Sequence, residues 1–170
     1  IATAPRPGAR GEGFDGRPDA REPSASPGGK VLDLGGRAAG EGGYARQLTD
    51  EERALQQQRL ADHLKNIDVI VATAAVPGRP APKIVSAAMV AGMKPGSVIV
   101  DLAAETGGNC ELTQPGKQIE HNGVIIYGPL NVPSLLPVHA SEMYAKNLLN
   151  FLSPMIKNGE LILDWDDEVI

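Results

Sequence analysis

Two short apolar runs with a helix-like segment between them dominate the middle of the chain. The runs DVIVATAAV (68–76) and SVIVDLA (97–103) are continuous and rich in β-branched residues, which is typical of parallel strands covered on both faces. Between them, Ser86 is a good N-cap for a short helix over 87–93, which Lys94-Pro95-Gly96 would end. The pattern predicts a β–α–β unit.

A longer helix is predicted before this unit. Thr49 is followed three residues later by Glu52, which is a capping-box pattern, and a run of strong helix formers continues it over residues 50–65. Before residue 30, by contrast, Pro5 and Pro7 would interrupt a helix, so the pattern there is weak.

Three further elements are predicted after Cys110. VIIYG (124–128) suits a third strand, and residues 140–152 have the apolar spacing of an amphipathic helix. The final run, 160–170, alternates like a strand that is exposed on one side. The succession of strands and helices predicts an α/β fold with a parallel sheet.

In open α/β sheets, ligands bind beyond the carboxyl ends of the strands. The residues to inspect are therefore Thr73-Ala74-Ala75 and Ala103-Ala104-Glu105. Asp101 is better interpreted as a buried structural hydrogen-bonding group, while Glu105 suits a ligand or a helix contact.

A glycine motif near the start is a misleading match. Residues 11–16, GEGFDG, fit G-x-G-x-x-G, but they do not follow a clear strand, and a poor helix start comes after them. We therefore reject a phosphate loop here. Asp15 closes the short run GEGF, where a dinucleotide fold places an acidic residue on the adenosine ribose; a turn residue is the alternative.

Composition excludes several functions. The 170 residues carry 16 basic and 21 acidic side chains and only 4% aromatics, which argues against a nucleic-acid or anionic membrane partner. A single cysteine, Cys110, excludes an internal disulfide and a cysteine-cluster metal site; a small side chain in a turn is favoured. No metal site is predicted: the acidic run at 164–168 is better explained as a solvated strand edge, with Trp165 packing between its members.

Several motifs together resemble one family. GGYA (42–45), MKPGSVIVDLAAETGGNCELT (93–113) and the ending LDWDDEVI resemble the alpha subunit of proton-translocating NAD(P) transhydrogenase over nearly the whole chain. Alanine dehydrogenase shares the PG…AP and MKPGSVIVD patterns, but GGYA, GGNCEL (107–112) and DWDDE (164–168) favour transhydrogenase.

The resemblance implies a Rossmann-like parallel sheet that lacks its first strand and its glycine loop, which would lie upstream of Ile1. Residues 1–132 would be a partial NAD(H)-binding subdomain. Residues 133–170 would be a return helix and the start of a second subdomain, including its strand.

The implied function is the NAD(H)-binding component of the transhydrogenase, an enzyme that transfers hydride between NAD(H) and NADP(H) on a partner domain. Membrane partners would couple this transfer to proton translocation. The component would be cytoplasmic, peripheral to the inner membrane through its partners, homodimeric and inactive alone.

The resemblance also assigns cofactor-binding residues. Asp15, Gly16 and Arg17 match a strand-ending Asp-Val-Arg that faces the adenosine half, with Gly16 departing from the usual Val. Gly43 and Tyr44 match the tip of a mobile loop that folds over the nucleotide; an incidental flexible linker is the alternative.

Two further assignments lie nearer the centre of the chain. Gln56 matches a helix position that helps to hold the nucleotide, and otherwise it would be a solvated helix residue. Thr73, Ala74 and Ala75 match the strand end beneath the nucleotide, with Ala75 replacing a commoner Leu. No catalytic residue is assigned, because the cofactors carry the chemistry.

Two other hypotheses stay open. One is an NAD-dependent amino-acid oxidoreductase of the alanine dehydrogenase type. The other is a non-catalytic α/β fragment that binds nothing tightly.

Overall fold

The computed structural model describes residues 8–14, 30–32, 34 and 49–167. Contacts divide the chain into two compact units. The first comprises Ile1–Val69, Ser86–Ser97 and His121–Val124, and the second comprises Ile70–Val85, Val98–Glu120 and Ile125–Ile170. The predicted boundary at residue 132 stays a prediction.

The first unit contains the predicted capped helix, α2, over Asp50–Leu64. The Glu52 amide donates to the Thr49 hydroxyl oxygen at 3.2 Å, and the Thr49 amide donates to the Glu52 carboxylate at 2.8 Å. Both halves of the capping box are therefore formed, which satisfies two amides that a helix start leaves without partners. The helix buries Leu60 and Leu64, so the prediction is confirmed to within one residue.

Two very short strands lie in the same unit, β1 (Glu12–Gly13) and β2 (Lys30–Val31), and they pair in parallel. Helix α2 contacts this segment through His63, whose Nε2 lies 2.8 Å from Glu12 Oε2. β1 lies within the G-x-G-x-x-G match, whereas a phosphate-binding glycine loop follows its strand. This geometry supports rejecting the motif.

Helix α3 (Ala87–Ala91) is capped as predicted, with the Met89 amide donating to Ser86 Oγ at 3.2 Å. It ends earlier than predicted because the Gly92 amide already closes the last turn on Ala88, Met89 and Val90. The following turn has Gly96 at φ +88°, a left-handed conformation that glycine adopts readily.

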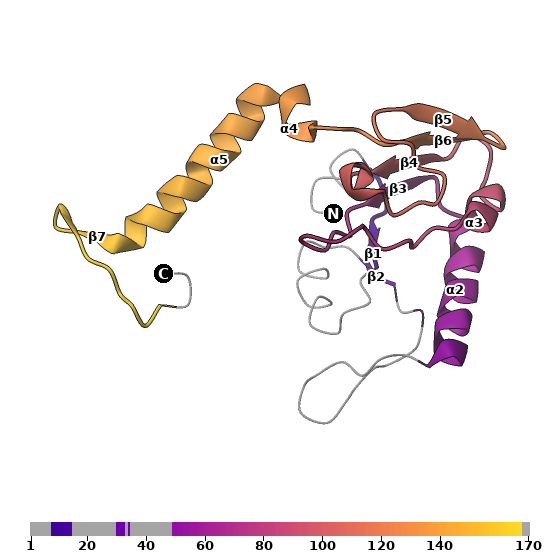
Figure 1. The fold of residues 1–170 in the computed structure, drawn as a ribbon, viewed down its shortest axis with the longest axis horizontal. Coiled ribbons are helices and arrows are strands. Elements are labelled where there is room, and N and C mark those ends of the chain that lie inside the picture. Colours follow the sequence, from indigo (N-terminus) through magenta and orange to yellow (C-terminus); the bar gives the residue numbers. More distant parts are fainter. Residues whose placement is uncertain (1–7, 15–29, 33, 35–48, 168–170) are drawn as a thin grey trace. The chain divides into compact units, whose positions relative to one another are not determined.

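The central sheet has four strands in the order β3-β4-β6-β5 (Figure 1). They are β3 (Val69–Ala72), β4 (Val98–Asp101), β5 (Gln118–His121) and β6 (Val124–Tyr127). β4 and β6 pair in parallel with Ile99 opposite Ile126, and both isoleucines are fully buried. The predicted α/β class with a mostly parallel sheet is confirmed.

Strand β5 was not predicted from the sequence. It is joined to β6 by Asn122 and Gly123, which have φ of 52° and 78°. Asn-Gly is the strongest short hairpin signal because both central residues of its turn need positive φ. The signal was present, but the polar sequence of β5 was interpreted as a loop.

The chain then forms α4 (Val132–Leu135), α5 (Pro137–Leu152), the 3₁₀ turn η3 (Ser153–Met155) and the antiparallel pair β7 (Ile156–Lys157) and β8 (Glu160–Leu161). The predicted return helix is present, and it begins three residues earlier than expected.

The predicted strand over 160–170 is largely wrong. Within the described part of this run, residues 160–167, only Glu160–Leu161 is a strand, and Asp164 accepts hydrogen bonds from the amides of Asp166 and Asp167 in a turn. The carboxylates of Asp164, Asp166 and Asp167 therefore do not line a strand edge. Trp165 is 77% exposed, so it does not pack between them. Within the described residues, no helix is both long and apolar enough to cross a bilayer.

Candidate functional site

The carboxyl ends of β3 and β4 meet in the second unit. The Leu102 amide donates to the Ala72 carbonyl at 2.9 Å, so the two chains are still hydrogen-bonded where their strands end. Beyond this bond, residues 73–75 continue from β3 while the chain after β4 turns away into the 3₁₀ helix η2 (Ala104–Thr106). The two segments expected from the sequence thus lie at one sheet edge.

Asp101 organises the turn after β4. Its carboxylate is fully buried and accepts hydrogen bonds from the Ala103 amide (3.1 Å), the Cys110 amide (2.9 Å) and the Thr113 hydroxyl (2.6 Å). Buried carboxylates are tolerated when such donors replace water. The prediction of a structural hydrogen-bonding role is confirmed.

Two glycines allow the chain to pass close to this carboxylate. Gly107 and Gly108 have φ of 102° and 80°. A Cβ on Gly108 would lie 2.7 Å from Asp101 Oδ2 and 2.7 Å from Thr113 Cγ2, whereas a Cβ on Gly107 would meet nothing within 4 Å. Gly108 is therefore required for both its conformation and its lack of a side chain.

Asn109 connects this turn to the end of β3. Its fully buried side chain accepts from the Ala74 amide at 3.0 Å and donates to the carbonyls of Ala74 (2.8 Å) and Pro82 (2.9 Å). Both backbone polar groups of Ala74 are therefore paired with one side-chain amide. The sequence did not predict a role for Asn109. Its position directly after two glycines near a strand end was the signal that could have indicated one.

The loop between β3 and α3 is fixed on the same turn. The Ala81 amide donates to the Thr106 carbonyl at 2.9 Å, and Lys83 Nζ donates to the carbonyls of Gly107 (2.5 Å) and Cys110 (3.3 Å). Two loops that are about 25 residues apart therefore hold each other at this edge.

Glu105 faces a different region of the unit. Its Oε1 accepts from the amide of Asn131 at 2.6 Å, and Asn131 is the residue before α4. Of the two roles expected for Glu105, the structure contains the helix contact.

Cys110 is fully buried and pairs through its backbone with Val85, in agreement with the interpretation as a small side chain in a turn. Burial raises the pKa of the Cys110 thiol, and the nearby Asp101 carboxylate adds to the shift. The thiol is therefore held in its neutral form.

The predicted cofactor residues have different outcomes. Thr73 and Ala75 are exposed and Ala74 is half-buried, all three at the sheet edge; Gln56 is half-buried on α2, in the other unit. Within the described residues of the chain, Thr73 and Ala75 make no hydrogen bond. The remaining assignments lie outside the described residues: Asp15, Gly16, Arg17, Gly43 and Tyr44.

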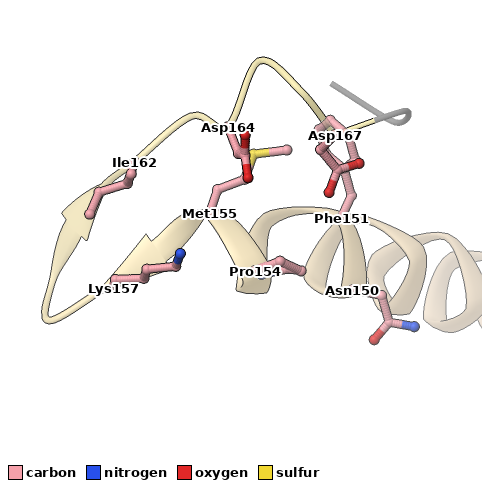
Figure 2. Close-up of a pocket in the computed structure, with 8 residues that line it drawn as sticks. All are labelled: Asn150, Phe151, Pro154, Met155, Lys157, Ile162, Asp164 and Asp167. Atoms are coloured by element: carbon pink, nitrogen blue, oxygen red, sulfur yellow. The ribbon is translucent and has the colours of Figure 1, made fainter.

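A separate cavity of about 290 Å³ lies at the C-terminal end of α5 (Figure 2). Phe151 and Asn150 reach it from the helix, while Lys157 and Ile162 come from the β7–β8 segment. Of the residues that line it, Met155 alone is buried. Neither its position nor its residues coincide with the predicted strand-end site.

A mostly parallel sheet with an open edge at the carboxyl ends of its strands defines an α/β protein of the Rossmann-like class. The family model for the alanine dehydrogenase/PNT C-terminal domain matches residues 1–170, and the chain belongs to this family.

The most informative relatives are transhydrogenases. The chain is 41% identical over 175 residues to NAD(P) transhydrogenase subunit alpha of Haemophilus influenzae, covering 100% of the chain and 34% of the relative. A crystal structure of transhydrogenase from Sinorhizobium meliloti superposes with a TM-score of 0.72 at 43% identity, covering 99% of the chain and 44% of that structure. The chain is therefore a homologue of the transhydrogenase alpha subunit, and it spans less than half the length of these relatives.

Similarity to alanine dehydrogenase is more limited. Alanine dehydrogenase 1 of Staphylococcus aureus is 33% identical over 106 residues, which cover 60% of the chain and 28% of that protein.

Proposed function

We propose that this chain is the NAD(H)-binding component of an NAD(P) transhydrogenase. The observation that carries the proposal is the open edge at Thr73–Ala75, where the exposed Thr73 and Ala75 make no hydrogen bond among the described residues. Such an edge is where open α/β sheets bind ligands. The relatives that match the whole chain are named as transhydrogenase alpha subunits, which supports NAD(H) as the ligand.

The residues at this edge suit a flat ligand. Thr73 offers a hydroxyl and Ala75 a methyl group, so nothing bulky rises from the strand end. The backbone between them is held by Asn109, which leaves a surface that does not have to rearrange on binding. We propose that the nucleotide of NAD(H) lies across residues 73–75.

The other predicted residues complete the proposed site. Asp15, Gly16 and Arg17 would face the adenosine ribose, Gln56 would help to hold the nucleotide, and Gly43 and Tyr44 would close over it. The phosphate-binding glycine loop and the first strand are proposed to come from residues outside this chain.

When bound, the cofactor supplies the chemistry by giving its hydride to NADP⁺ on the partner domain. The chain's own residues bind the cofactor, orient it and exclude water from it. Positioning can contribute much of the rate, since two nicotinamides held in reacting geometry no longer have to find each other. The proposal therefore places no acid, base or nucleophile in this chain.

The proposed partners are the NADP(H)-binding and membrane domains of the transhydrogenase, which couple hydride transfer to proton translocation, together with a second copy of the subunit. The proposed location is the cytoplasmic side of the inner membrane, reached through these partners. Activity is expected only in their presence.

Hydride-transfer assays test the proposal. The full-length protein, mixed with its NADP(H)-binding partner, is expected to reduce an NADP analogue with NADH. In parallel, NADH oxidation is measured with pyruvate and ammonia. Pyruvate-dependent oxidation without the partner would overturn the proposal in favour of an alanine dehydrogenase activity, and no NADH binding would favour a non-catalytic fragment.

A further inference from the structure

The chain just beyond β3 is held by a side chain instead of by a neighbouring strand. Beside β3 and β4, the Leu102 amide still donates to the carbonyl of Ala72, the last residue of β3. Two residues further on, where the next pairing position of β3 would face β4, the chain after β4 has already turned into η2. Asn109 fills this position.

The amide of Asn109 reproduces what a strand would offer. Its oxygen accepts from the Ala74 amide and its nitrogen donates to the Ala74 carbonyl, at 3.0 and 2.8 Å, so Ala74 is paired as it would be in a sheet. The backbone of Asn109 is also held, because its backbone carbonyl accepts from the amides of Ile84 (2.8 Å) and Val85 (3.1 Å). The backbone of the pairing partner is therefore held in place by two hydrogen bonds of its own.

This pairing determines the direction of the neighbouring groups. Backbone polar groups alternate along an extended chain, so fixing Ala74 toward Asn109 directs those of Thr73 and Ala75 away from it. These are the residues that make no hydrogen bond within the described stretches of the chain.

We propose that Asn109 is a positioning residue that sets the nucleotide-binding surface at Thr73–Ala75 without touching the nucleotide itself. The inference rests on the proposed function. It predicts that Asn109 controls NAD(H) affinity through the hydrogen-bond pattern that it presents to Ala74, beyond any effect on folding.

The variant Asn109→Asp separates these two roles. A protonated carboxyl has one O–H donor and one C=O acceptor, so it can keep both bonds to Ala74 and loses only one of the two donated bonds of the amide, the one to Pro82. An ionised carboxylate only accepts, and it would face the carbonyls of Ala74 and Pro82. Other titratable groups in this turn, Asp101, Cys110 and Lys83, are unchanged between the variant and the wild type.

NADH is titrated into the full-length wild type, Asn109→Asp and Cys110→Ala from pH 5 to pH 8, with thermal unfolding recorded at each pH. Cys110→Ala is the control, since Cys110 is the adjacent, equally buried side chain. We expect Asn109→Asp to bind NADH near the wild-type level at low pH and about tenfold more weakly at high pH. Wild type and Cys110→Ala are expected to change together.

The outcomes separate the two proposals. If folded Asn109→Asp follows the wild-type pH profile, the positioning role is overturned while the proposed function stands. If affinity falls only where the thermal unfolding curve shows loss of folded protein, Asn109 is merely structural and the inference is again overturned. If the wild type itself does not bind NADH, the proposed function fails.

Discussion

At the residue scale, one turn accounts for most of the order at the candidate site. The Asp101 carboxylate accepts three hydrogen bonds, and Gly108 lets the chain pass beside that carboxylate. The Asn109 side chain then hydrogen-bonds Ala74, just beyond β3. The sequence predicted Asp101 as a buried structural hydrogen-bonding residue, and the structure contains its three donors. The sequence did not identify Asn109, because its partner Ala74 lies 35 residues away.

Replacement of Asp101 tests this turn. Asp101→Ala leaves three buried donors without an acceptor and is expected to lower the free energy of unfolding by about 3 kcal/mol. Glu120→Gln, on the exposed side of β5, is the control and should stay near wild type. Urea denaturation measures both, and equal midpoints would contradict the account.

The adjacent glycines form a matched pair. Both have positive φ, but only a Cβ at Gly108 would meet the Asp101 carboxylate and Thr113. Gly108→Ala is therefore expected to lose about 2 kcal/mol more stability than Gly107→Ala. If the two variants unfold at the same denaturant concentration, crowding at Gly108 is not significant.

Ionisation of the buried Cys110 thiol is expected to make the stability of the fold depend on pH. Burial raises the pKa of its thiol in the folded state, so the unfolded chain loses this proton first as the pH rises. The contribution of the neutral thiol to the free energy of unfolding is present below about pH 8.5 and is lost above it. Stability measured from pH 7 to pH 10 should fall less steeply in Cys110→Ala than in the wild type, whereas parallel slopes would show that the thiol ionises freely in the folded protein.

At the element scale, local signals were reliable where they were complete within a few residues. The capping box at Thr49 and the cap at Ser86 both formed as predicted, because each requires only contacts three residues apart. The strand expected over 160–170 is absent from residues 162–167 because alternation alone does not create a pairing partner; the Asp164 carboxylate accepts from the Asp166 amide in a turn instead. β5 was missed because its polar residues hid the Asn122-Gly123 turn.

The cap of α2 can be tested directly. Thr49→Ala removes the oxygen that accepts from the Glu52 amide and is expected to cost about 1 kcal/mol of stability. Gln57→Ala, at an exposed position in the middle of the same helix, is the control and should cost nothing or be slightly stabilising. Amide exchange in the first turn of α2 should accelerate in Thr49→Ala alone; unchanged exchange would mean that the cap does not hold this helix.

At the scale of the whole molecule, the α/β class was predictable and the complete site was not. Buried strands that alternate with helices leave a strong compositional pattern, so the sheet followed from the sequence. The predicted apolar face of the return helix is real, but α5 buries no residue within the described chain. Five of the nine predicted cofactor residues lie outside the described residues, so their roles stay predictions.

The central claim is that NAD(H) binds at the strand-end edge. Hydrogen–deuterium exchange of the full-length protein with and without NADH tests it most directly. The account predicts that NADH slows exchange at Thr73 and Ala75, whose amides have no partner among the described residues, and leaves the cavity segment at 150–167 unchanged. Protection confined to 150–167, with unchanged exchange at residues 73–75, would contradict it.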